Sequence, residues 1–211
     1  MKRLDLSETL RDGEPQPLRI VSCGILKYEI RKLIQKGKIN AEAHFLSKNL
    51  HSDPVKLEKT LDKVLSNYRV DGGPRPVLVY GDVCMGFDME IKAVAAKHEA
   101  VKVDALNCID CLLGGGGELL RIDPEHVYLF LTTGFIEFTE RIMGQTVEET
   151  RKMFSMLKGI ILIDALGDLE QYRNRIEAIS DRTGLPILET RKVGLDPLKK
   201  VLSEAIERAY P

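Results

Sequence analysis

The sequence has no excess of either charge and no long apolar run, and each absence excludes a class of protein. Its 211 residues include 31 Lys and Arg and 32 Asp and Glu, so the formal net charge is −1. Nucleic-acid-binding proteins usually carry a basic excess or a basic stripe, and we therefore expect no nucleic-acid partner. No apolar run reaches the roughly 18 residues that a membrane-spanning helix needs, so we expect no membrane partner either.

Cysteine is scarce as well, and the sequence has four. The cellular compartment decides whether such cysteines form disulfides or take part in metal binding or thiol chemistry. Residues 1–17 are charged and lack the apolar centre of a secretory signal peptide, so we expect a cytoplasmic protein. Gly13, Pro15 and Pro17 interrupt this stretch, which predicts an irregular N-terminal arm over residues 1–17. Inside the cell, cysteines indicate metal binding or thiol chemistry rather than disulfides.

Motifs that identify several common sites are absent too. The sequence has no G-x-x-x-x-G-K-[ST] phosphate loop, and no G-x-G-x-x-G follows its first predicted strand. It has no G-x-S-x-G nucleophile elbow and no H-E-x-x-H zinc motif. It also lacks D-x-H-x-x-G, so binding of a corrinoid by this chain itself has little support. The chemistry must therefore be sought in the arrangement of single residues.

Short apolar runs alternate with amphipathic segments along the chain, which is typical of α/β proteins. The runs are continuously apolar, as expected for a parallel sheet that is covered on both faces. Strands are predicted over residues 18–22, 39–46, 77–80, 101–106, 127–132, 160–163 and 186–189, and helices over residues 25–37, 53–68, 89–98, 145–157, 169–182 and 196–209. We predict a single α/β domain over residues 18–211, in which one Rossmann-like, doubly wound, mostly parallel sheet carries helices on both faces.

Residues 101–118, VKVDALNCIDCLLGGGGE, combine a predicted strand with two cysteines and four consecutive glycines. Cys108 and Cys111 are expected in the first turn of a helix, where the partial positive charge of the N-terminus favours thiolates. The glycines suit a left-handed backbone or a close approach to another group. Two interpretations stay open for this stretch alone: a thiolate site, or two buried cysteines beside a flexible turn.

All four cysteines fall beside the ends of predicted strands. Cys23 closes the first strand, Cys84 follows the third and Cys108 follows the fourth. His51 lies in the connection after the second strand. The carboxyl ends of parallel strands meet at one edge of a sheet, where ligands bind, so neighbouring strands would bring these residues together. Three thiolates and one imidazole suit Zn²⁺, and cysteine ligands also suit an iron–sulfur cluster. The residues predicted to line the same crevice are Gly24, Gly81, Gly114, Thr133 and Gly134.

Alternatives remain for the individual residues. Cys23 and Cys84, taken singly, are also typical of small core residues. His51, taken singly, also suits a surface or capping histidine. Cys111 suits a fourth sulfur ligand, a redox partner of Cys108, or a buried residue that faces the sheet. The other three histidines have no cysteine beside them in the sequence, and we predict that they are structural or solvated.

Five short motifs occur in a fixed order along the chain. They are Cys23-Gly24, Leu50-His51 with Pro54, Tyr80-Gly81 with Cys84, Cys108 with Leu112-Leu113-Gly114, and Thr133-Gly134. In this order and at about these distances they resemble a family of uncharacterised proteins, a domain of unknown function found in methanogenic archaea and anaerobic bacteria. The resemblance covers residues 18–190. Cys111 lies outside the family pattern, which disfavours its pairing with Cys108, and Phe135 stands where the family has a tryptophan.

The resemblance implies a role in one-carbon metabolism, because family members often lie near genes for corrinoid-dependent methyl transfer. Together with the cysteines it predicts a metal-binding protein with zinc as the preferred ion and with Cys23, Cys84 and Cys108 as ligands. His51, a water or a substrate thiol takes the fourth place. Such a site would catalyse or assist methyl transfer between a methyl carrier, such as a corrinoid protein, and a small-molecule thiol. The alternatives are a non-catalytic accessory protein that handles metal or corrinoid, and a thiol redox protein that uses Cys108 and Cys111.

Overall fold

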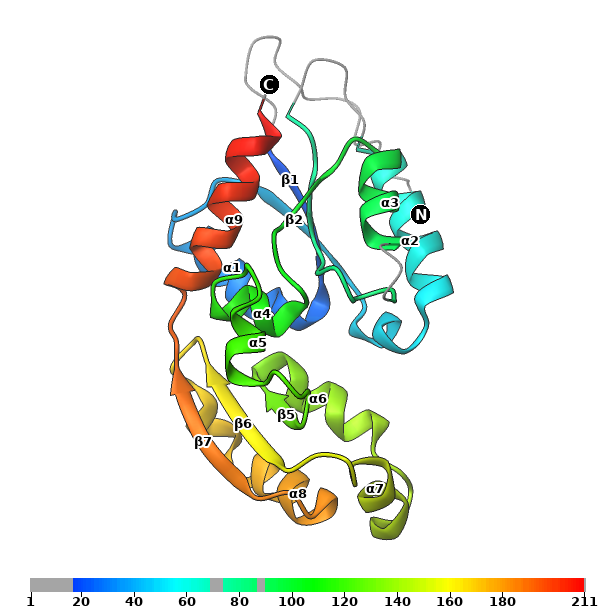
Figure 1. Cartoon of the computed structure of the whole chain (residues 1–211). Helices are drawn as coiled ribbons and strands as arrows, with labels where there is room; N and C mark the ends of the chain where they lie inside the picture. Colours follow the sequence, from blue (N-terminus) through cyan, green and yellow to red (C-terminus); the bar gives the residue numbers. More distant parts are fainter. Residues whose placement is uncertain (1–16, 69–73, 87–89, 211) are drawn as a thin grey trace, which may run out of the picture.

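The structure, a computed structural model, describes residues 17–68, 74–86 and 90–210, and its strands form two parallel sheets (Figure 1). The strands are β1 (Arg19–Cys23), β2 (Glu42–Leu46), β3 (Val77–Val79), β4 (Val101–Lys102), β5 (Tyr128–Leu131), β6 (Gly159–Asp164) and β7 (Ile187–Lys192). The four-stranded sheet has the order β2-β1-β3-β4, and the three-stranded sheet has the order β5-β6-β7. Paired strands run parallel in both sheets.

Helices lie against both sheets. The α-helices are α1 (Lys27–Gln35), α2 (Pro54–Ser66), α3 (Glu90–Lys97), α4 (Cys108–Leu113), α5 (Glu118–Ile122), α6 (Thr133–Ile142), α7 (Val147–Met153), α8 (Arg173–Thr183) and α9 (Asp196–Ala209). Short 3₁₀ helices are η1 (Gly24–Leu26), η2 (Lys48–Ser52) and η3 (Leu169–Tyr172). Figure 1 shows α2 and α3 on one side of the four-stranded sheet and the C-terminal helix α9 on the other. Helices α6, α7 and α8 accompany the three-stranded sheet.

The predicted Rossmann-like α/β class is confirmed, but the strands divide between two sheets where one was predicted. β4 pairs with β3, and β5 pairs with β6. Between β4 and β5 the chain forms α4 and α5 around four glycines with positive φ, so β5 begins a second sheet instead of extending the first. A buried parallel strand has the same apolar pattern in one continuous sheet as in two separate sheets. The pattern alone therefore does not distinguish one sheet from two. The predicted arm lies outside the described residues, apart from Pro17, and the single domain stays a prediction.

Two helices begin at the signals that the sequence carries. Asp53 caps α2 by accepting a hydrogen bond from the Lys56 N–H at 2.9 Å, and Pro54 occupies the first turn. Thr146 and Glu149 form a capping box at the start of α7. These caps satisfy backbone N–H groups that would otherwise lack a partner at a helix start. Local sequence therefore fixes where both helices begin.

Helix α6, which has no counterpart among the predicted elements, joins the two halves of the molecule. Thr132 caps it by accepting a hydrogen bond from the Phe135 N–H at 3.2 Å. A Cβ built on Gly134 would lie 2.1 Å from the Ile25 carbonyl oxygen, so glycine is what lets α6 approach η1 so closely. Because α6 follows β5 and η1 follows β1, this contact brings the carboxyl ends of the two sheets together.

A hydrophobic core is shared between the two sheets. The larger buried cluster combines residues of β1, β3 and α9 with Ile161 and Ile163 of β6. The chain returns from β7 through α9 to pack against β3 and β4 of the first sheet. A smaller cluster around Leu131, Ile136 and Ile179 lies among β5, α6 and α8. Burial of apolar surface on both sides therefore holds the junction of the sheets in place.

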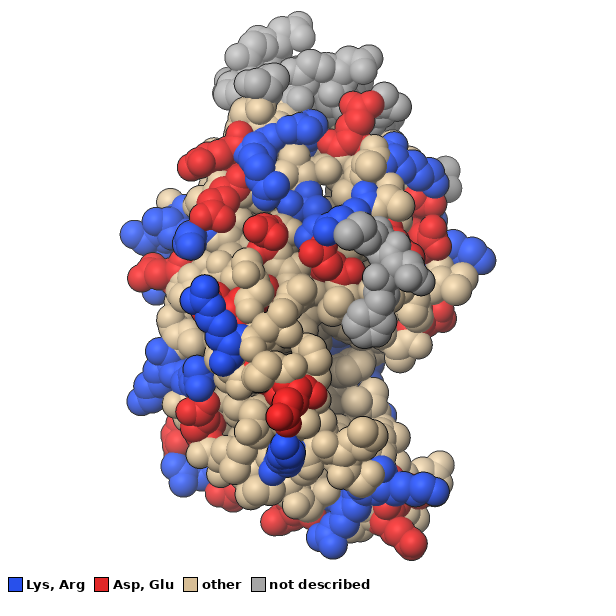
Figure 2. All heavy atoms as spheres, in the orientation of Figure 1, with Lys and Arg blue, Asp and Glu red and all other residues tan. Residues whose placement is uncertain are grey.

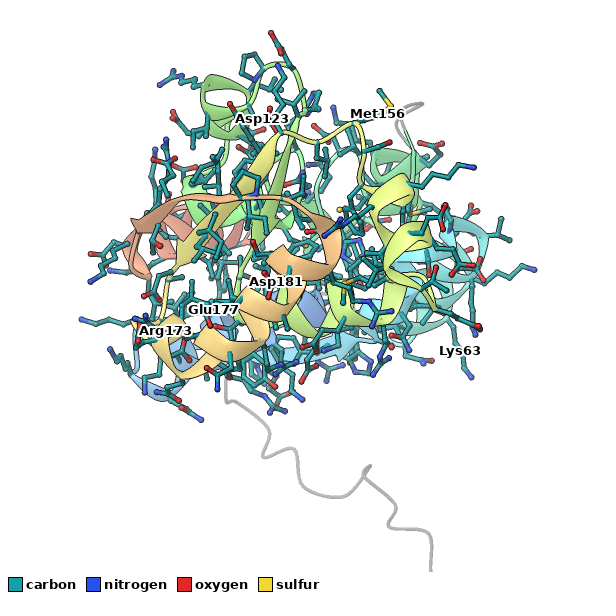
Figure 3. The ribbon with its side chains drawn as sticks, turned by 90° about the horizontal axis from the view of Figure 1, so that it is seen from below. Lys63, Asp123, Met156, Arg173, Glu177 and Asp181 are labelled. Atoms are coloured by element: carbon teal, nitrogen blue, oxygen red, sulfur yellow. The ribbon has the colours of Figure 1, made fainter. Side chains whose placement is uncertain are left out.

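The surface carries charges of both signs. Basic and acidic side chains are interspersed over the face shown in Figure 2, in keeping with the net charge of −1. From below, α8 presents Arg173, Glu177 and Asp181 to solvent (Figure 3), while Ile176 and Ile179 of the same helix are buried. No helix in the described residues has the length and apolar character needed to cross a membrane.

Candidate metal centre

Neighbouring strands carry three cysteines to one edge of the four-stranded sheet. Cys23 is the last residue of β1, Cys84 lies in the turn after β3, and Cys108 opens α4 after β4. β1, β3 and β4 are adjacent in the sheet. His51 lies in η2, which follows β2 at the same edge. The strand order thus brings together residues as distant in the sequence as Cys23 and Cys108, at the edge where parallel sheets bind ligands.

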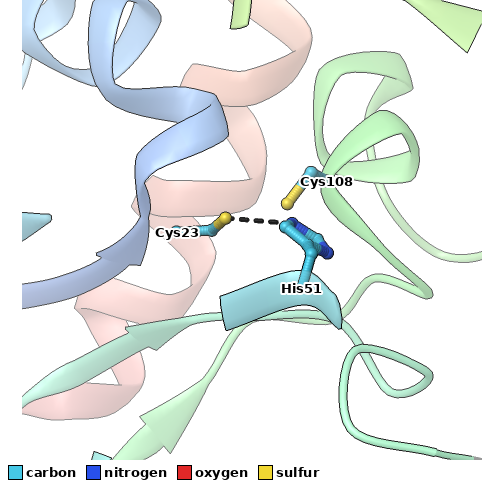
Figure 4. Close-up of side chains that lie close together, drawn as sticks. All are labelled: Cys23, His51 and Cys108. Atoms are coloured by element: carbon cyan, nitrogen blue, oxygen red, sulfur yellow. Dashed lines mark hydrogen bonds between the residues drawn. The ribbon is translucent and has the colours of Figure 1, made fainter. Parts of the chain in front are cut away.

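Cys23, His51 and Cys108 form a compact group at this edge (Figure 4). Their ligand atoms, two sulfurs and one imidazole nitrogen, all lie within 4.8 Å of one another. Cys23 Sγ and His51 Nε2 are 3.0 Å apart, which is a hydrogen-bond distance. Both cysteines are 1% exposed, and His51 is half-buried. Within the described ranges this is the single group of three or more His, Cys, Asp or Glu side chains with ligand atoms so close.

Cys84 adjoins this group without belonging to it. Its Sγ accepts a hydrogen bond from the Gly81 N–H at 3.3 Å, and its side chain is also hydrogen-bonded to Cys108. A Cβ built on Gly81 would lie 2.1 Å from the Leu106 carbonyl oxygen, so glycine allows the turn after β3 to approach the segment before α4. As a result, the Cys108 thiol has both Cys23 and Cys84 as hydrogen-bond partners.

The three cysteines differ in their tendency to ionise. The hydrogen bond from Cys108 lowers the pKa of Cys23 to about 5 against the effect of burial, and His51 adds to the lowering. The hydrogen bond from Cys108 also lowers the pKa of Cys84. The pKa of Cys108 itself is raised well above its ordinary value, because its thiol bonds to the other two sulfurs and is buried. In the metal-free chain these effects act against the thiolate form of Cys108 that the start of a helix would favour.

Helix α6 covers one side of His51. The His51 ring centroid lies 6.0 Å from that of Phe135 and 5.5 Å from that of Phe138. Burial acts to lower the pKa of His51, but the hydrogen bond and the charge of Cys23 outweigh burial, and the pKa is raised. Helix α6, which follows β5 of the three-stranded sheet, thus forms an aromatic wall beside the group. The ligand atoms of the group all come from the ends of strands in the four-stranded sheet or from the segments that follow them.

A buried tyrosine hydroxyl near the sulfurs has no partner among the described residues. Tyr80, the residue after β3, is 2% exposed, and its hydroxyl makes no hydrogen bond with any described residue. Burial raises the pKa of Tyr80 well above its ordinary value, and the neighbouring Cys23, Cys108 and Cys84 raise it further. An unpaired buried hydroxyl costs about 1–3 kcal/mol. The site therefore holds a donor that the described side chains do not use.

Cys111 and the four glycines belong to the packing around α4. Burial raises the pKa of Cys111, whose side chain is 1% exposed. The carboxylate of Asp110 holds the glycine turn by accepting hydrogen bonds from the backbone N–H groups of Leu106, Gly117 and Leu119. Gly114 ends α4 in the left-handed conformation and lines a separate cavity beside Pro197. The glycines thus shape a structural turn at the far end of α4 from Cys108.

The remaining predicted crevice residues lie where β1 and β5 end. Gly24 opens η1 and lines a small cavity beside β2. Thr133 donates a hydrogen bond to Asp168 Oδ1 at 3.0 Å, on the side of the three-stranded sheet. Gly134 provides the close contact between α6 and η1. These residues connect the two sheets next to the compact group.

Sequence reasoning misses two parts of this site. One is α6, although Phe135, Phe138 and Ile142 recur at helical spacing after the capping residue Thr132. The other is the Tyr80 hydroxyl, which no local pattern identifies. Its lack of a partner depends on side chains that β1, β3 and α4 bring around it.

The fold and the site together define an α/β protein with a candidate transition-metal centre of cysteine and histidine at the carboxyl edge of a parallel sheet. The chain belongs to the family described as Protein of unknown function (DUF1638), whose model matches residues 45–202. The match includes His51, Cys84 and Cys108 and begins after Cys23. The predicted membership of a family of unknown function is thereby confirmed. No curated protein and no solved structure matches the chain.

Proposed function

We propose that Cys23, His51 and Cys108 bind one transition-metal ion and that this ion is Zn²⁺. The observation that carries the proposal is the spacing of their ligand atoms, which all lie within 4.8 Å of one another. In a tetrahedral zinc site with Zn–S of about 2.3 Å and Zn–N of about 2.1 Å, ligand atoms are roughly 3.5–3.8 Å apart. Cys23 Sγ and His51 Nε2 are 3.0 Å apart and no two ligand atoms of the group are more than 4.8 Å apart, so the group lies close to that spacing.

The protonation of Cys23 suits a metal. Cys23 already favours the thiolate form, because its pKa is lowered to about 5. The Cys108 thiol loses its proton when its sulfur coordinates the ion, since a coordinating thiol is deprotonated outright. An iron–sulfur cluster is the alternative cofactor, but such clusters usually take four cysteines, and the compact group offers two cysteines and one imidazole.

The fourth position decides whether the centre is structural or catalytic. Zinc sites with four protein ligands are structural, whereas catalytic sites keep three protein ligands and one exchangeable position. Cys84 lies outside the compact group, and the Tyr80 hydroxyl has no described partner. Both observations support a fourth position that takes a water or a substrate, with Tyr80 as a hydrogen-bond donor to it. If Cys84 moved to coordinate the ion, the site would be closed and the protein would be a non-catalytic accessory protein.

Methyl transfer is the reaction that we propose for such an open site. It rests on the methyl-transfer context that the resemblance of the sequence motifs implies, together with the ability of zinc to stabilise a bound thiolate at neutral pH. A small-molecule thiol would lose its proton on binding, and its sulfur would take the methyl group of a carrier such as a corrinoid protein. With methylcobalamin the products are the methyl thioether and cob(I)alamin, so atoms and electrons balance. Thiol redox chemistry has less support, because the raised pKa of Cys111 disfavours the thiolate that such chemistry needs.

Titration of the metal-free protein with Co²⁺ tests the proposed centre. Cobalt takes the same tetrahedral site, and its absorption spectrum reports thiolate ligands. We expect thiolate-to-cobalt charge transfer that saturates at one equivalent and is lost in Cys108→Ala. Cys111→Ala serves as the matched control, because it removes a neighbouring buried thiol outside the group. Equal spectra from the wild-type chain and Cys108→Ala would contradict the proposal.

Release of cob(I)alamin from methylcobalamin in the presence of a thiol tests the reaction separately.

A further inference from the structure

A small cavity lies beside the metal group, between the end of β2 and helix α6. Its volume is about 300 Å³, at the lower end of the range for small-molecule sites. It is lined by Gly24, Lys27, Tyr28, Phe45, Leu46, Ser47, Lys48, Glu137 and Arg141, and we call it the Lys48 pocket. The pocket shares η2 with His51 and α6 with the aromatic wall of the metal group. It therefore sits at the carboxyl edge of β1 and β2, where parallel sheets bind ligands.

The lining of this pocket has more positive than negative charge. It contains the three cations Lys27, Lys48 and Arg141 and the single carboxylate Glu137, which pairs with Lys48. Arg141 donates a hydrogen bond to the neutral side-chain oxygen of Asn49 and pairs with no described carboxylate. The Lys27 side chain makes no ion pair or hydrogen bond with any described residue. Lys27 and Arg141 are thus left without a counter-charge from the described residues.

The cations of the pocket act on one another. The Lys48 side chain is only 16% exposed. Burial lowers the pKa of Lys48, and the nearby charges of Arg141, Arg175 and Lys27 lower it further. Arg175 makes two hydrogen bonds to Glu140, and this pair is neutral as a whole. Its presence therefore leaves the surplus of two positive charges unchanged, and a bound anion would relieve their repulsion.

The larger groove on the protein has a smaller surplus of positive charge. Its volume is about 760 Å³, and it lies along β4 and α9. Its lysines, Lys92 and Lys102, both pair with Asp82, at 3.5 and 2.9 Å. Arg75 and Arg208 also line it, together with Asp104 and Glu204, so four cations face three carboxylates and the surplus is one positive charge. Charge thus singles out the smaller cavity rather than the larger one.

We propose that the Lys48 pocket binds the carboxylate or phosphate group of a small anionic ligand. Lysine and arginine recognise both groups through charge-assisted hydrogen bonds, and Ser47 and the backbone of Gly24 add polar surface. The volume admits a small molecule and excludes a folded partner. This assignment stands on the charges and shape of the pocket and does not depend on a metal at the neighbouring cysteines.

Calorimetric titration of the full chain tests the proposal. Inorganic phosphate and succinate are the two probes, and each is titrated at low salt in the presence of a metal chelator. The chelator removes any binding of the probe to a metal, so a failure here is distinct from a failure of the metal centre. We expect at least one probe to bind with one site per chain and to weaken as salt is added. The tighter probe identifies whether phosphate or carboxylate is the preferred group.

Substitutions locate the binding. Loss of one charge-assisted hydrogen bond of about 1.5–3 kcal/mol corresponds to about 10- to 100-fold in affinity, and we expect this weakening in Lys48→Met and in Arg141→Met. Lys27→Met, which removes a cation with no described partner, provides a variant with little risk to folding. Lys63→Met is the matched control, because Lys63 is exposed on α2 and points away from the protein (Figure 3). No binding of either probe at millimolar concentration, or equal weakening in Lys63→Met, would overturn the proposal.

Discussion

Replacing Glu29 with glutamine is expected to stabilise the protein above neutral pH. Glu29 lies on α1, is 1% exposed, and its Oε2 has no hydrogen-bond partner among the described residues. Burial raises the pKa of this carboxyl from 4.5 to about 7, a hydrogen bond from its own backbone N–H opposes the rise, and the carboxylate of Asp168 adds to it. The site therefore favours a neutral side chain, and glutamine supplies one at every pH.

The sign and size of the effect follow from the raised pKa. The stabilisation from a neutral Glu29 is fully present below pH 4.5, the pKa of the unfolded chain, and is lost as the pH rises through about 7. A rise in pKa from 4.5 to about 7, at about 1.36 kcal/mol for each pH unit, amounts to roughly 3 kcal/mol. At pH 8 the Glu29→Gln variant should therefore be more stable than the wild-type chain by up to this amount.

Urea denaturation at several pH values, with a chelator present throughout, measures the difference. The gain in the free energy of unfolding should be near zero at pH 4 and should grow as the pH rises through 7. Glu177→Gln is the control, because Glu177 is exposed on α8 and should give no such trend (Figure 3). A gain in Glu29→Gln that is the same at pH 4 and pH 8 would refute the reasoning, because it would not come from ionisation of this carboxyl.

Three further predictions test the site. Tyr80→Phe should leave the metal-free protein as stable or about 1 kcal/mol more stable, because it removes an unpaired buried hydroxyl; a clear loss in urea denaturation would mean that the hydroxyl has a partner. Cys108→Ala should lose the metal and Cys111→Ala should keep it, as judged by metal analysis after gel filtration; equal loss would assign both to the ligand set. His51→Ala should weaken zinc affinity by at least about 10-fold with an unchanged circular dichroism spectrum, and an unchanged affinity would remove His51 from the ligands.

The proximity of Cys23, His51 and Cys108 is predictable from the sequence because it depends only on where each residue lies relative to a strand and on the direction of the strands. Each residue follows a strand, and parallel strands place their carboxyl ends at one edge. The residues then meet whenever their strands are neighbours, as β2, β1, β3 and β4 are. Apolar runs and the cap residue Asp53 likewise predict elements that the structure contains.

The features that escape prediction depend on contacts between distant segments. The strands of both sheets are short apolar runs. The hydrophobic pattern of the sequence therefore does not show that the strands divide into two sheets after β4. The ionisation of Cys108 is set by Cys23 and Cys84, which lie on other strands, and these neighbours reverse the effect expected from its helix. The Lys48 pocket needs Arg141 of α6 beside η2, and that juxtaposition exists only after the two sheets pack together.

The metal content of the purified protein tests the central claim most directly. Protein prepared without oxygen and analysed by mass spectrometry for metals should carry about one zinc ion per chain, as a single-ion site requires. The double variant Cys23→Ala/Cys108→Ala, prepared in the same way, should be folded and free of metal. Wild-type protein that is folded, contains no transition metal and takes up neither zinc nor iron on dialysis would contradict the account.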